Sequence, residues 1–86
     1  MMPDKEISSI SPIIVKKIKK IIANHFGAEE GGIVFDTDIA DDLKLDNLDI
    51  IELTMALEEE FQLVIPDFDA ERWRTVGDIV NYIENK

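Results

Sequence analysis

The chain has 86 residues, a length that suits one small domain. Such a domain buries only about 60–65% of the surface that its unfolded chain exposes, so a large internal active site is not expected. It contains no cysteine, so disulfides, a thiolate nucleophile and sulfur-based zinc sites are excluded. The formal net charge of -10 disfavours nucleic acid and membranes as partners, and with no signal-peptide pattern and no long apolar run we expect a soluble cytoplasmic protein.

A first helix is predicted to begin at Ser11-Pro12 and to end before Gly27. Ser11 can cap it, Pro12 is tolerated in its first turn, and Gly27 suits the left-handed residue beyond its end. The residues that recur at three- and four-residue spacing are Ile10, Ile14, Ile18, Ile21 or Ile22, and His25 or Phe26. The lysines of this segment are Lys16, Lys17, Lys19 and Lys20. We interpret them as a solvated helix face; a basic peptide that binds nucleic acid or lipid is disfavoured because the rest of the chain is acidic.

Residues 28–46 are predicted to form a long connection that packs onto the core. The segment holds two adjacent glycines and several aspartates, and its apolar residues are Ile33, Val34, Phe35, Ile39, Leu43 and Leu45. A loop of this length is uncommon in a compact domain unless it is functional or packed by its own side chains. The apolar residues favour packing.

The segment from about Asn47 to Phe61 is predicted to be a helix with two apolar stripes, and Pro66 marks its downstream limit. At about 100° per residue, the side that suits the core carries Ile50, Leu53, Thr54, Leu57 and Phe61. A different side carries Leu48, Ile51 and Met55, bordered by Glu52 and Glu59. An apolar strip with acidic edges is typical of a docking surface for a partner with a basic rim. The alternative is that the packed segment 28–46 or the short helix covers this strip.

A short helical segment and a last helix complete the chain. Residues 67–74 can supply one or two helical turns that place Phe68 and Trp73 against the core. Thr75 then caps a last helix, with Asp78 three residues later as the acidic member of a capping box. The buried stripe of this helix is predicted to consist of Val76, Ile79, Val80 and Ile83.

Catalytic and metal-binding chemistry is disfavoured. His25 has no nucleophile or second ligand in its neighbourhood, so we interpret it as a capping or half-buried residue. The aspartates at positions 36, 38, 41 and 42 suggest calcium. However, an EF-hand loop beginning at Asp36 would have Ala40, Asp41 and Asn47 where a ligand, a glycine and a glutamate are needed. The adjacent glycines lack the spacing of a phosphate loop. We expect no metal site and no enzymatic activity.

Three runs carry an extended resemblance to a known family: DLKLDNLD at 42–49, IELTMALEEEF at 51–61 and IPD at 65–67. The similarity continues through residues 70–71 and 75–76 to residues 78–83, and it covers most of residues 10–86. The chain resembles the bacterial acyl carrier proteins of fatty-acid synthesis. This implies an all-α fold, a four-helix bundle with three main helices and a short third helix, in a single domain of residues 1–86. Whether residues 1–9 are ordered or disordered stays open.

In that family an Asp-Ser-Leu motif begins the second helix, and the serine hydroxyl carries phosphopantetheine, whose thiol holds the acyl group. Asp46 and Leu48 match the motif, whereas Asn47 stands in place of the serine. The resemblance therefore implies a cofactor-binding site at Asp46, Asn47 and Leu48 from which the hydroxyl is missing. A carboxamide nitrogen is not a usable nucleophile, so we expect phosphopantetheine to be absent from this chain. Asparagine is as good a helix cap as serine, so the fold should be unaffected.

The resemblance also implies partners. Enzymes of the family read the second helix, and matching by position assigns partner binding to Leu48, Asp49, Ile51, Glu52, Met55, Glu58 and Glu59. The expected partners are a phosphopantetheinyl transferase, for a serine form, and acyl-transfer and chain-elongation enzymes with basic docking surfaces. The chain itself is expected to be a monomer. Phe68, Trp73 and Arg74 are bulkier or more basic than the family pattern, which leaves the size of an acyl-chain cavity open.

Two functions are compatible with these observations. The first is an acyl carrier scaffold that tethers and presents acyl intermediates in fatty-acid or related biosynthesis, but that cannot be phosphopantetheinylated because of Asn47. The second is a noncarrying paralogue that acts as a protein-docking or regulatory module. The first predicts that restoring serine creates a transferase substrate, whereas the second predicts partner binding whatever residue occupies position 47.

Overall fold

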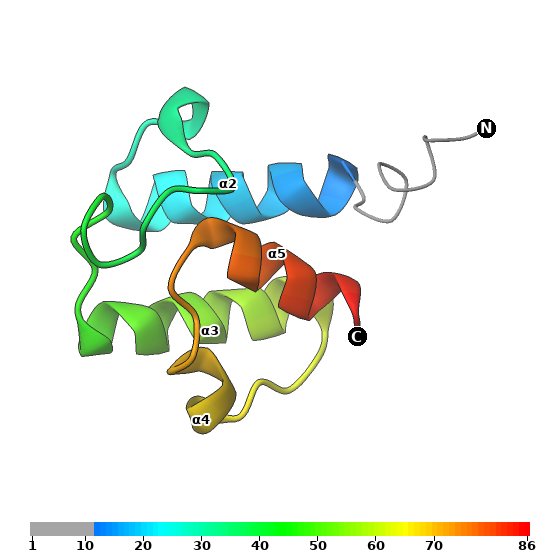
Figure 1. Cartoon of the computed structure of the whole chain (residues 1–86). Helices are drawn as coiled ribbons and strands as arrows, with labels where there is room; N and C mark the ends of the chain where they lie inside the picture. The colour runs from blue at the N-terminus through cyan, green and yellow to red at the C-terminus, as the bar shows by residue number, and fades with distance from the viewer. Residues whose placement is uncertain (1–11) are drawn as a thin grey trace.

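The structure, a computed structural model, describes residues 12–86 (Figure 1). The elements are α2 (Pro12–Phe26), the 3-10 helix η1 (Glu30–Gly32), α3 (Asn47–Phe61), the four-residue α4 (Asp67–Ala70) and α5 (Val76–Glu84). The predicted cap at Ser11, the apolar position Ile10 and the open question about residues 1–9 lie outside the described residues. Within 12–86, the predicted arrangement of three main helices and a short one before the last is confirmed.

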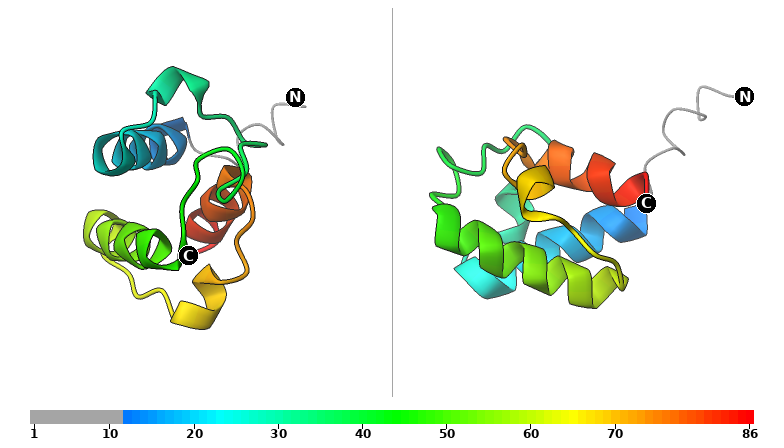
Figure 2. Two further views of the ribbon diagram at one scale, coloured as in Figure 1. Left: turned by 90° about the vertical axis from the view of Figure 1, so that its left-hand side faces the viewer. Right: turned by 90° about the horizontal axis from the view of Figure 1, so that it is seen from below.

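Helices α2, α3 and α5 surround a common core, and α4 lies beside α3 at the edge of the bundle (Figures 1 and 2). The buried core residues of the three helices are Ile18 and Ile22, then Leu53 and Leu57, then Val76, Ile79, Val80 and Ile83. They belong to the stripes predicted from the sequence, and burying each contributes roughly 1.5–3 kcal/mol. Over residues 12–86, none of the helices is long and apolar enough to cross a membrane.

The connection between α2 and α3 packs onto the core, as its apolar residues predict. Ile33, Ile39 and Leu45 are buried, whereas Val34 is an exception at 53% exposed. Backbone hydrogen bonds tie the connection to the start of α5: Gly77 N–H to Phe35 O at 2.9 Å, Val76 N–H to Thr37 O at 3.0 Å and Ile39 N–H to Arg74 O at 2.9 Å. These bonds fix the segment that leads into α3. The short η1 turn within it was not predicted.

The first turn of α3 is capped by Asp46 and not by Asn47. The Asp49 N–H donates to Asp46 Oδ1 at 2.9 Å, and the Asp46 N–H donates to Asp49 Oδ2 at 3.1 Å, which forms a reciprocal capping box. The prediction that asparagine replaces serine as the cap is therefore wrong, because residue 47 is already the first helical residue. The predicted capping box between Thr75 and Asp78 at the start of α5 is confirmed.

The end of α3 and the single turn of α4 depart in part from expectation. α3 ends at Phe61 because Gln62 adopts a left-handed conformation with a φ of 54°. In α4, Ala70 is buried and Phe68 points outward at 65% exposed, so the prediction that Phe68 packs on the core is wrong. Residues two apart on a helix point about 200° away from each other, so only one of the two can face the core. Trp73, just after α4, is partly buried against the core as predicted.

Candidate functional site

Asn47 begins α3 with an exposed side chain, between two residues that the resemblance also assigns to the site. On one side, the backbone N–H of Asp49 donates to the Asp46 carboxylate and holds the pKa of Asp46 below its usual value. On the other side, Leu48 is 71% exposed. The three predicted site residues therefore lie together at an exposed helix N-terminus, where Asp46 caps the helix while Asn47 and Leu48 face outward.

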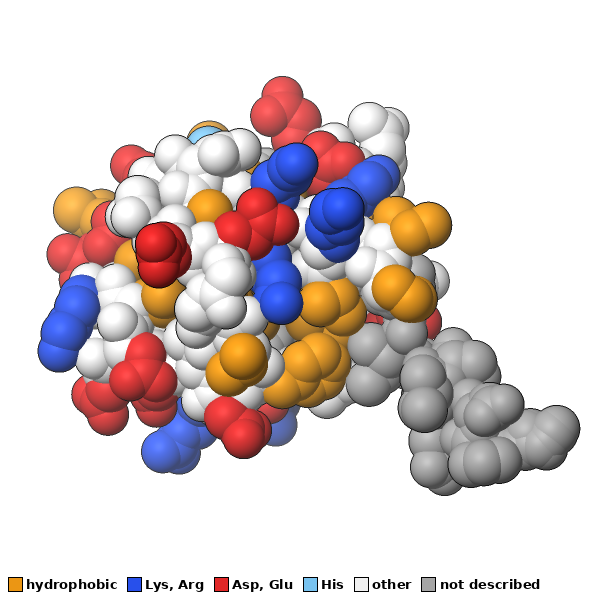
Figure 3. Space-filling model, turned by 90° about the horizontal axis from the view of Figure 1, so that it is seen from above, with side chains coloured by type: hydrophobic (Ala, Val, Ile, Leu, Met, Phe, Trp, Pro, Cys, Tyr) orange, Lys and Arg blue, Asp and Glu red, His pale blue; other side chains and the backbone are white. Residues whose placement is uncertain are grey.

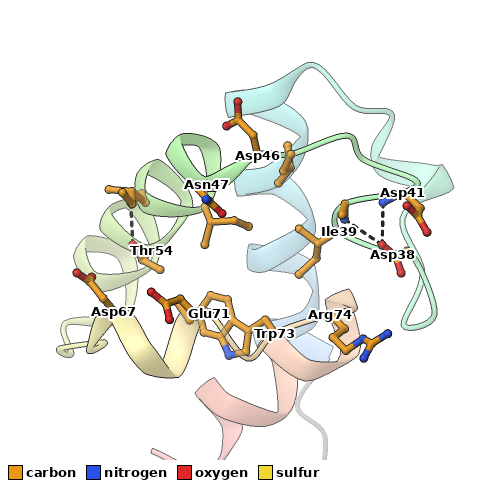
Figure 4. Close-up of a pocket in the computed structure, with 15 residues that line it drawn as sticks. Asp38, Ile39, Asp41, Asp46, Asn47, Thr54, Asp67, Glu71, Trp73 and Arg74 are labelled. Atoms are coloured by element: carbon orange, nitrogen blue, oxygen red, sulfur yellow. Dashed lines mark hydrogen bonds between the residues drawn. The ribbon is translucent and has the colours of Figure 1, made fainter.

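A pocket of about 560 Å³ opens beside Asn47, between the first half of α3, α4 and the connection before α3 (Figure 4). Its apolar lining consists of Ile39, Ala40, Leu45, Ile50, Ile51, Ala70 and Trp73. Its charged lining consists of five carboxylates, those of Asp38, Asp41, Asp46, Asp67 and Glu71, and the guanidinium of Arg74. A lining that is partly apolar and mainly negative in charge suits an uncharged apolar chain better than an anion.

The contribution of α4 to this pocket was not predicted. Figure 4 shows the side chains of Thr54, Glu71 and Trp73 facing the same space as Asn47, and Asp67 adds a carboxylate from the start of α4. The only sequence signal was the unusual bulk of Trp73 near the short helix. A periodic sequence pattern predicts which face of a single helix is buried, but it does not predict which segments pack against each other.

The aspartates before α3 shape the loop. Asp38 Oδ1 accepts the N–H groups of Ala40 at 3.0 Å and Asp41 at 2.7 Å, and Asp42 Oδ2 accepts the Asp38 N–H at 2.8 Å. Among residues 12–86, no group of three or more histidine, aspartate or glutamate side chains is arranged to hold a metal ion. Backbone hydrogen bonding by Asp38 and Asp42 gives this acidic run a structural role.

The second apolar stripe of α3 is exposed. Leu48, Ile51 and Met55 are 71%, 48% and 61% exposed, and Glu52 and Glu59 are exposed beside them. We call these five residues the docking strip. The alternative, that a neighbouring segment covers the stripe, is wrong for the described residues.

Two further residues predicted for partner binding have structural hydrogen bonds. Asp49 closes the capping box with Asp46 and is only partly exposed. Glu58 is also partly buried, and its Oε2 accepts the N–H of Ile65 at 2.7 Å, which anchors the segment that leads to α4. Both carboxylates lie on α3 near the docking strip, but each is held by the backbone.

Helix α2 presents the basic side chains on another face. Lysines gather over this helix in Figure 3, and Lys16, Lys17 and Lys20 are exposed, as expected for a solvated face. Lys17 Nζ lies 3.2 Å from the Glu60 carboxylate of α3. His25 lies in the last turn of α2, where a basic residue suits the helix C-terminus, but it is exposed, so the prediction of a half-buried position is wrong.

Known proteins share this fold and much of this sequence. Residues 16–83 match the family described as Phosphopantetheine attachment site. Acyl carrier proteins from three strains of Clostridium perfringens are each 52% identical to the chain over 67 residues, which cover 78% of this chain and 88% of each relative. The solved structure of an acyl carrier protein from Enterococcus faecalis matches with a TM-score of 0.73 at 40% identity, over 85% of this chain and 92% of that one.

These similarities agree with the geometry of the site. The structural match confirms the predicted acyl-carrier bundle, and the family consists of carriers rather than enzymes. The relatives support an acyl carrier role in fatty-acid synthesis. Because the family match spans most of its length and its relatives are half identical, the chain belongs to the acyl carrier proteins of the phosphopantetheine-attachment family.

Proposed function

We propose that this chain is an acyl carrier scaffold for fatty-acid or related biosynthesis whose arm-attachment position is Asn47, so that it cannot be phosphopantetheinylated as it stands. One observation carries the proposal: Asn47 is exposed at the start of α3, beside a partly apolar pocket, while Asp46 makes the helix cap. An attachment residue has to be reachable by a transferase and close to a shelter for its cargo. Position 47 meets both requirements.

The side chain at this position does not suit phosphopantetheine. The carboxamide nitrogen of Asn47 shares its lone pair with the adjoining carbonyl, so it cannot act as the nucleophile that a serine hydroxyl would supply. The surroundings do not favour holding the phosphate without a covalent bond either, because five carboxylates and one guanidinium line the adjoining pocket. We expect the chain to lack the group.

Partner enzymes are proposed to bind the docking strip. Its apolar members Leu48, Ile51 and Met55 offer anchors that a partner can desolvate, and Glu52 and Glu59 offer charges for a basic rim. Asp49 and Glu58 add negative potential from the same helix while keeping their backbone hydrogen bonds. The strip therefore favours an enzyme whose docking surface is apolar at its centre and basic at its edge.

The proposed partners are a phosphopantetheinyl transferase, for a serine-bearing form, and acyl-transfer and chain-elongation enzymes with basic docking surfaces. We propose a monomer with a single acyl-carrier-like domain, working in the cytoplasm without nucleic-acid or membrane partners. The net charge of -10 supports a monomer without polyanionic partners, since it opposes association with polyanions and with further copies of the chain.

A noncarrying paralogue is less favoured, because the half-identical relatives are acyl carrier proteins. The test is the intact mass of this chain and of Asn47→Ser after incubation with coenzyme A and a broad-specificity phosphopantetheinyl transferase. Only the serine form should gain the arm. Asn47→Ala, which removes the carboxamide at the same position without adding a hydroxyl, is the matched control and should stay unmodified. The carrier proposal is wrong if Asn47→Ser is not modified.

A further inference from the structure

Trp73 lies between two hollows of the molecule. It lines the pocket of about 560 Å³ beside Asn47 and also a second hollow of about 470 Å³ along α5. No other residue within 12–86 lines both. Figure 4 shows the indole of Trp73 on the side of the pocket across from Asn47. The indole therefore forms a partition between the two spaces.

Neighbouring groups fix the position of this indole. Its ring centroid lies 5.5 Å from that of Tyr82, in an edge-to-face arrangement with an angle of 69° between the planes. The Tyr82 hydroxyl donates to Asp69 Oδ2 at 2.7 Å, and the backbone N–H of Trp73 donates to Ala70 O at 3.1 Å. Because Tyr82 packs against the ring and the backbone of Trp73 is bonded to the α4 turn, a guest in the pocket would have to break the contact with Tyr82 to move the indole.

The indole also occupies its place at a cost. Its Nε1 is buried and has no hydrogen-bond partner among residues 12–86. A buried donor without a partner is unfavourable, and a phenyl or aliphatic side chain would avoid this cost. The wide, rigid ring at this position sets the shape of the pocket wall across from Asn47.

We propose that Trp73 is a specificity-determining residue that limits the length of the apolar chain accepted by the pocket beside Asn47. A chain entering past Asn47 first meets the apolar lining and then the indole. The space beyond is polar, with Asp69, Asp78 and Lys86 among its lining residues, so it offers little to further methylenes. The inference rests on the proposed function, because cargo length matters only in a protein that shelters an acyl chain.

The test uses straight-chain alkanols from butanol to decanol, which need no prosthetic arm and carry no charge for the acidic lining to repel. Binding to the full chain is measured from amide chemical shifts in NMR spectra. Affinity should rise about fourfold per added methylene, the fold-change equivalent to ~0.8 kcal/mol, and should stop rising at the length where the chain meets the indole. In Trp73→Ala, this plateau should move to longer alkanols, because further methylenes can fill the volume that the indole vacates.

Two further variants keep the test decisive. Phe68→Ala removes an exposed aromatic ring near Trp73 in the sequence. This ring does not line the pocket, so the plateau of the variant should match that of the unaltered chain. Trp73→Phe preserves an aromatic ring should alanine prevent folding, and its plateau should shift by less. The inference is overturned if both Trp73 variants reach their plateau at the same alkanol length as the unaltered chain. It is also overturned if the alkanols do not bind beside Asn47. The mass assay on Asn47→Ser is independent, so failure of the carrier proposal is recognised separately from failure of this one.

Discussion

Tyr82 and Asp69 are joined by a 2.7 Å hydrogen bond in which the phenol donates to the carboxylate. The bond connects α5 to the short helix α4. Burial, the hydrogen bond to Asp69 and the negative charges of Asp69 and Glu58 raise the pKa of Tyr82 to about 12. The link depends on the phenol proton, because a phenolate would face the carboxylate with like charge.

We therefore expect the stability of the unaltered chain to fall more steeply in alkali than that of Tyr82→Phe. The folded pKa of about 12 lies above the unfolded value of about 10, so the folded state keeps a proton that the unfolded state releases. The stabilisation is complete below about pH 10 and is lost as the pH rises towards 12. At neutral pH the variant should lose about 1 kcal/mol with its hydrogen bond. Urea unfolding across this range measures both effects, and parallel pH profiles would contradict the prediction.

Substitutions at adjacent positions should separate the cap from the attachment position. Asp46→Ala should lower the midpoint of thermal unfolding by several degrees, because it removes the cap of α3, whereas Asn47→Ala should leave the midpoint nearly unchanged. Since folding lowers the pKa of Asp46, its contribution should be present above the unfolded value near pH 4 and disappear as the pH falls through the folded value. Circular dichroism measures the midpoints. Equal losses in the two variants would show that Asp46 is not the main cap.

Glycine at position 62 should stabilise the fold. Gln62 has a φ of 54°, a conformation that costs a residue with a Cβ atom but not glycine. Gln62→Gly should therefore raise the free energy of unfolding by about 0.5 kcal/mol after the added freedom of the unfolded chain is counted. The control is Glu59→Gly, which lies inside α3 and should lower it by about 1 kcal/mol. Urea unfolding measures both variants. If both raised or both lowered the free energy of unfolding, this account of how α3 ends would be contradicted.

A charge placed within the docking strip should disrupt partner binding. Met55→Glu puts a carboxylate where an apolar anchor is expected, so the affinity for a phosphopantetheinyl transferase should fall by about tenfold or more. Val64→Glu adds the same charge at a residue that is 78% exposed and outside the strip, and it should have a much smaller effect. Calorimetric titration at low and high salt checks both variants, and the affinity should weaken with salt. The proposal fails if the two variants lose affinity equally or if Met55→Glu loses none.

Local chemistry predicted most of the helices. The bounds of α3, the capping box of Thr75 and Asp78, and the buried stripe of α5 follow from patterns that lie within a few residues of one another. The cap of α3 was misplaced by one residue, because Asp46 and Asn47 are equally good caps by residue type. Choosing between them requires the backbone geometry that Leu45 and the preceding loop impose.

Tertiary contacts account for the remaining errors. Phe68 points outward and Ala70 inward because α3 and α5 decide which side of a one-turn helix faces the core, and four residues carry too little periodicity to predict it. The lining of the pocket beside Asn47 was not predicted for the same reason, because Glu71 and Trp73 come from the segment that follows α4. The resemblance could place Asn47 in a helix but could not show what lies opposite it.

Because residues 46 and 49 form the capping box of α3, the side chain of residue 47 is not needed to cap the helix. Copies of this chain and of its Asn47→Ser form would therefore offer partners the same folded surface. In a mixture, a partner that binds only the folded surface would divide between the two in proportion to their concentrations, whereas a partner that also binds the arm of a phosphopantetheinylated serine form would favour that form. The chain can thus serve as a competitor of known stoichiometry, which measures how much of a partner's affinity comes from the protein surface and how much from the arm.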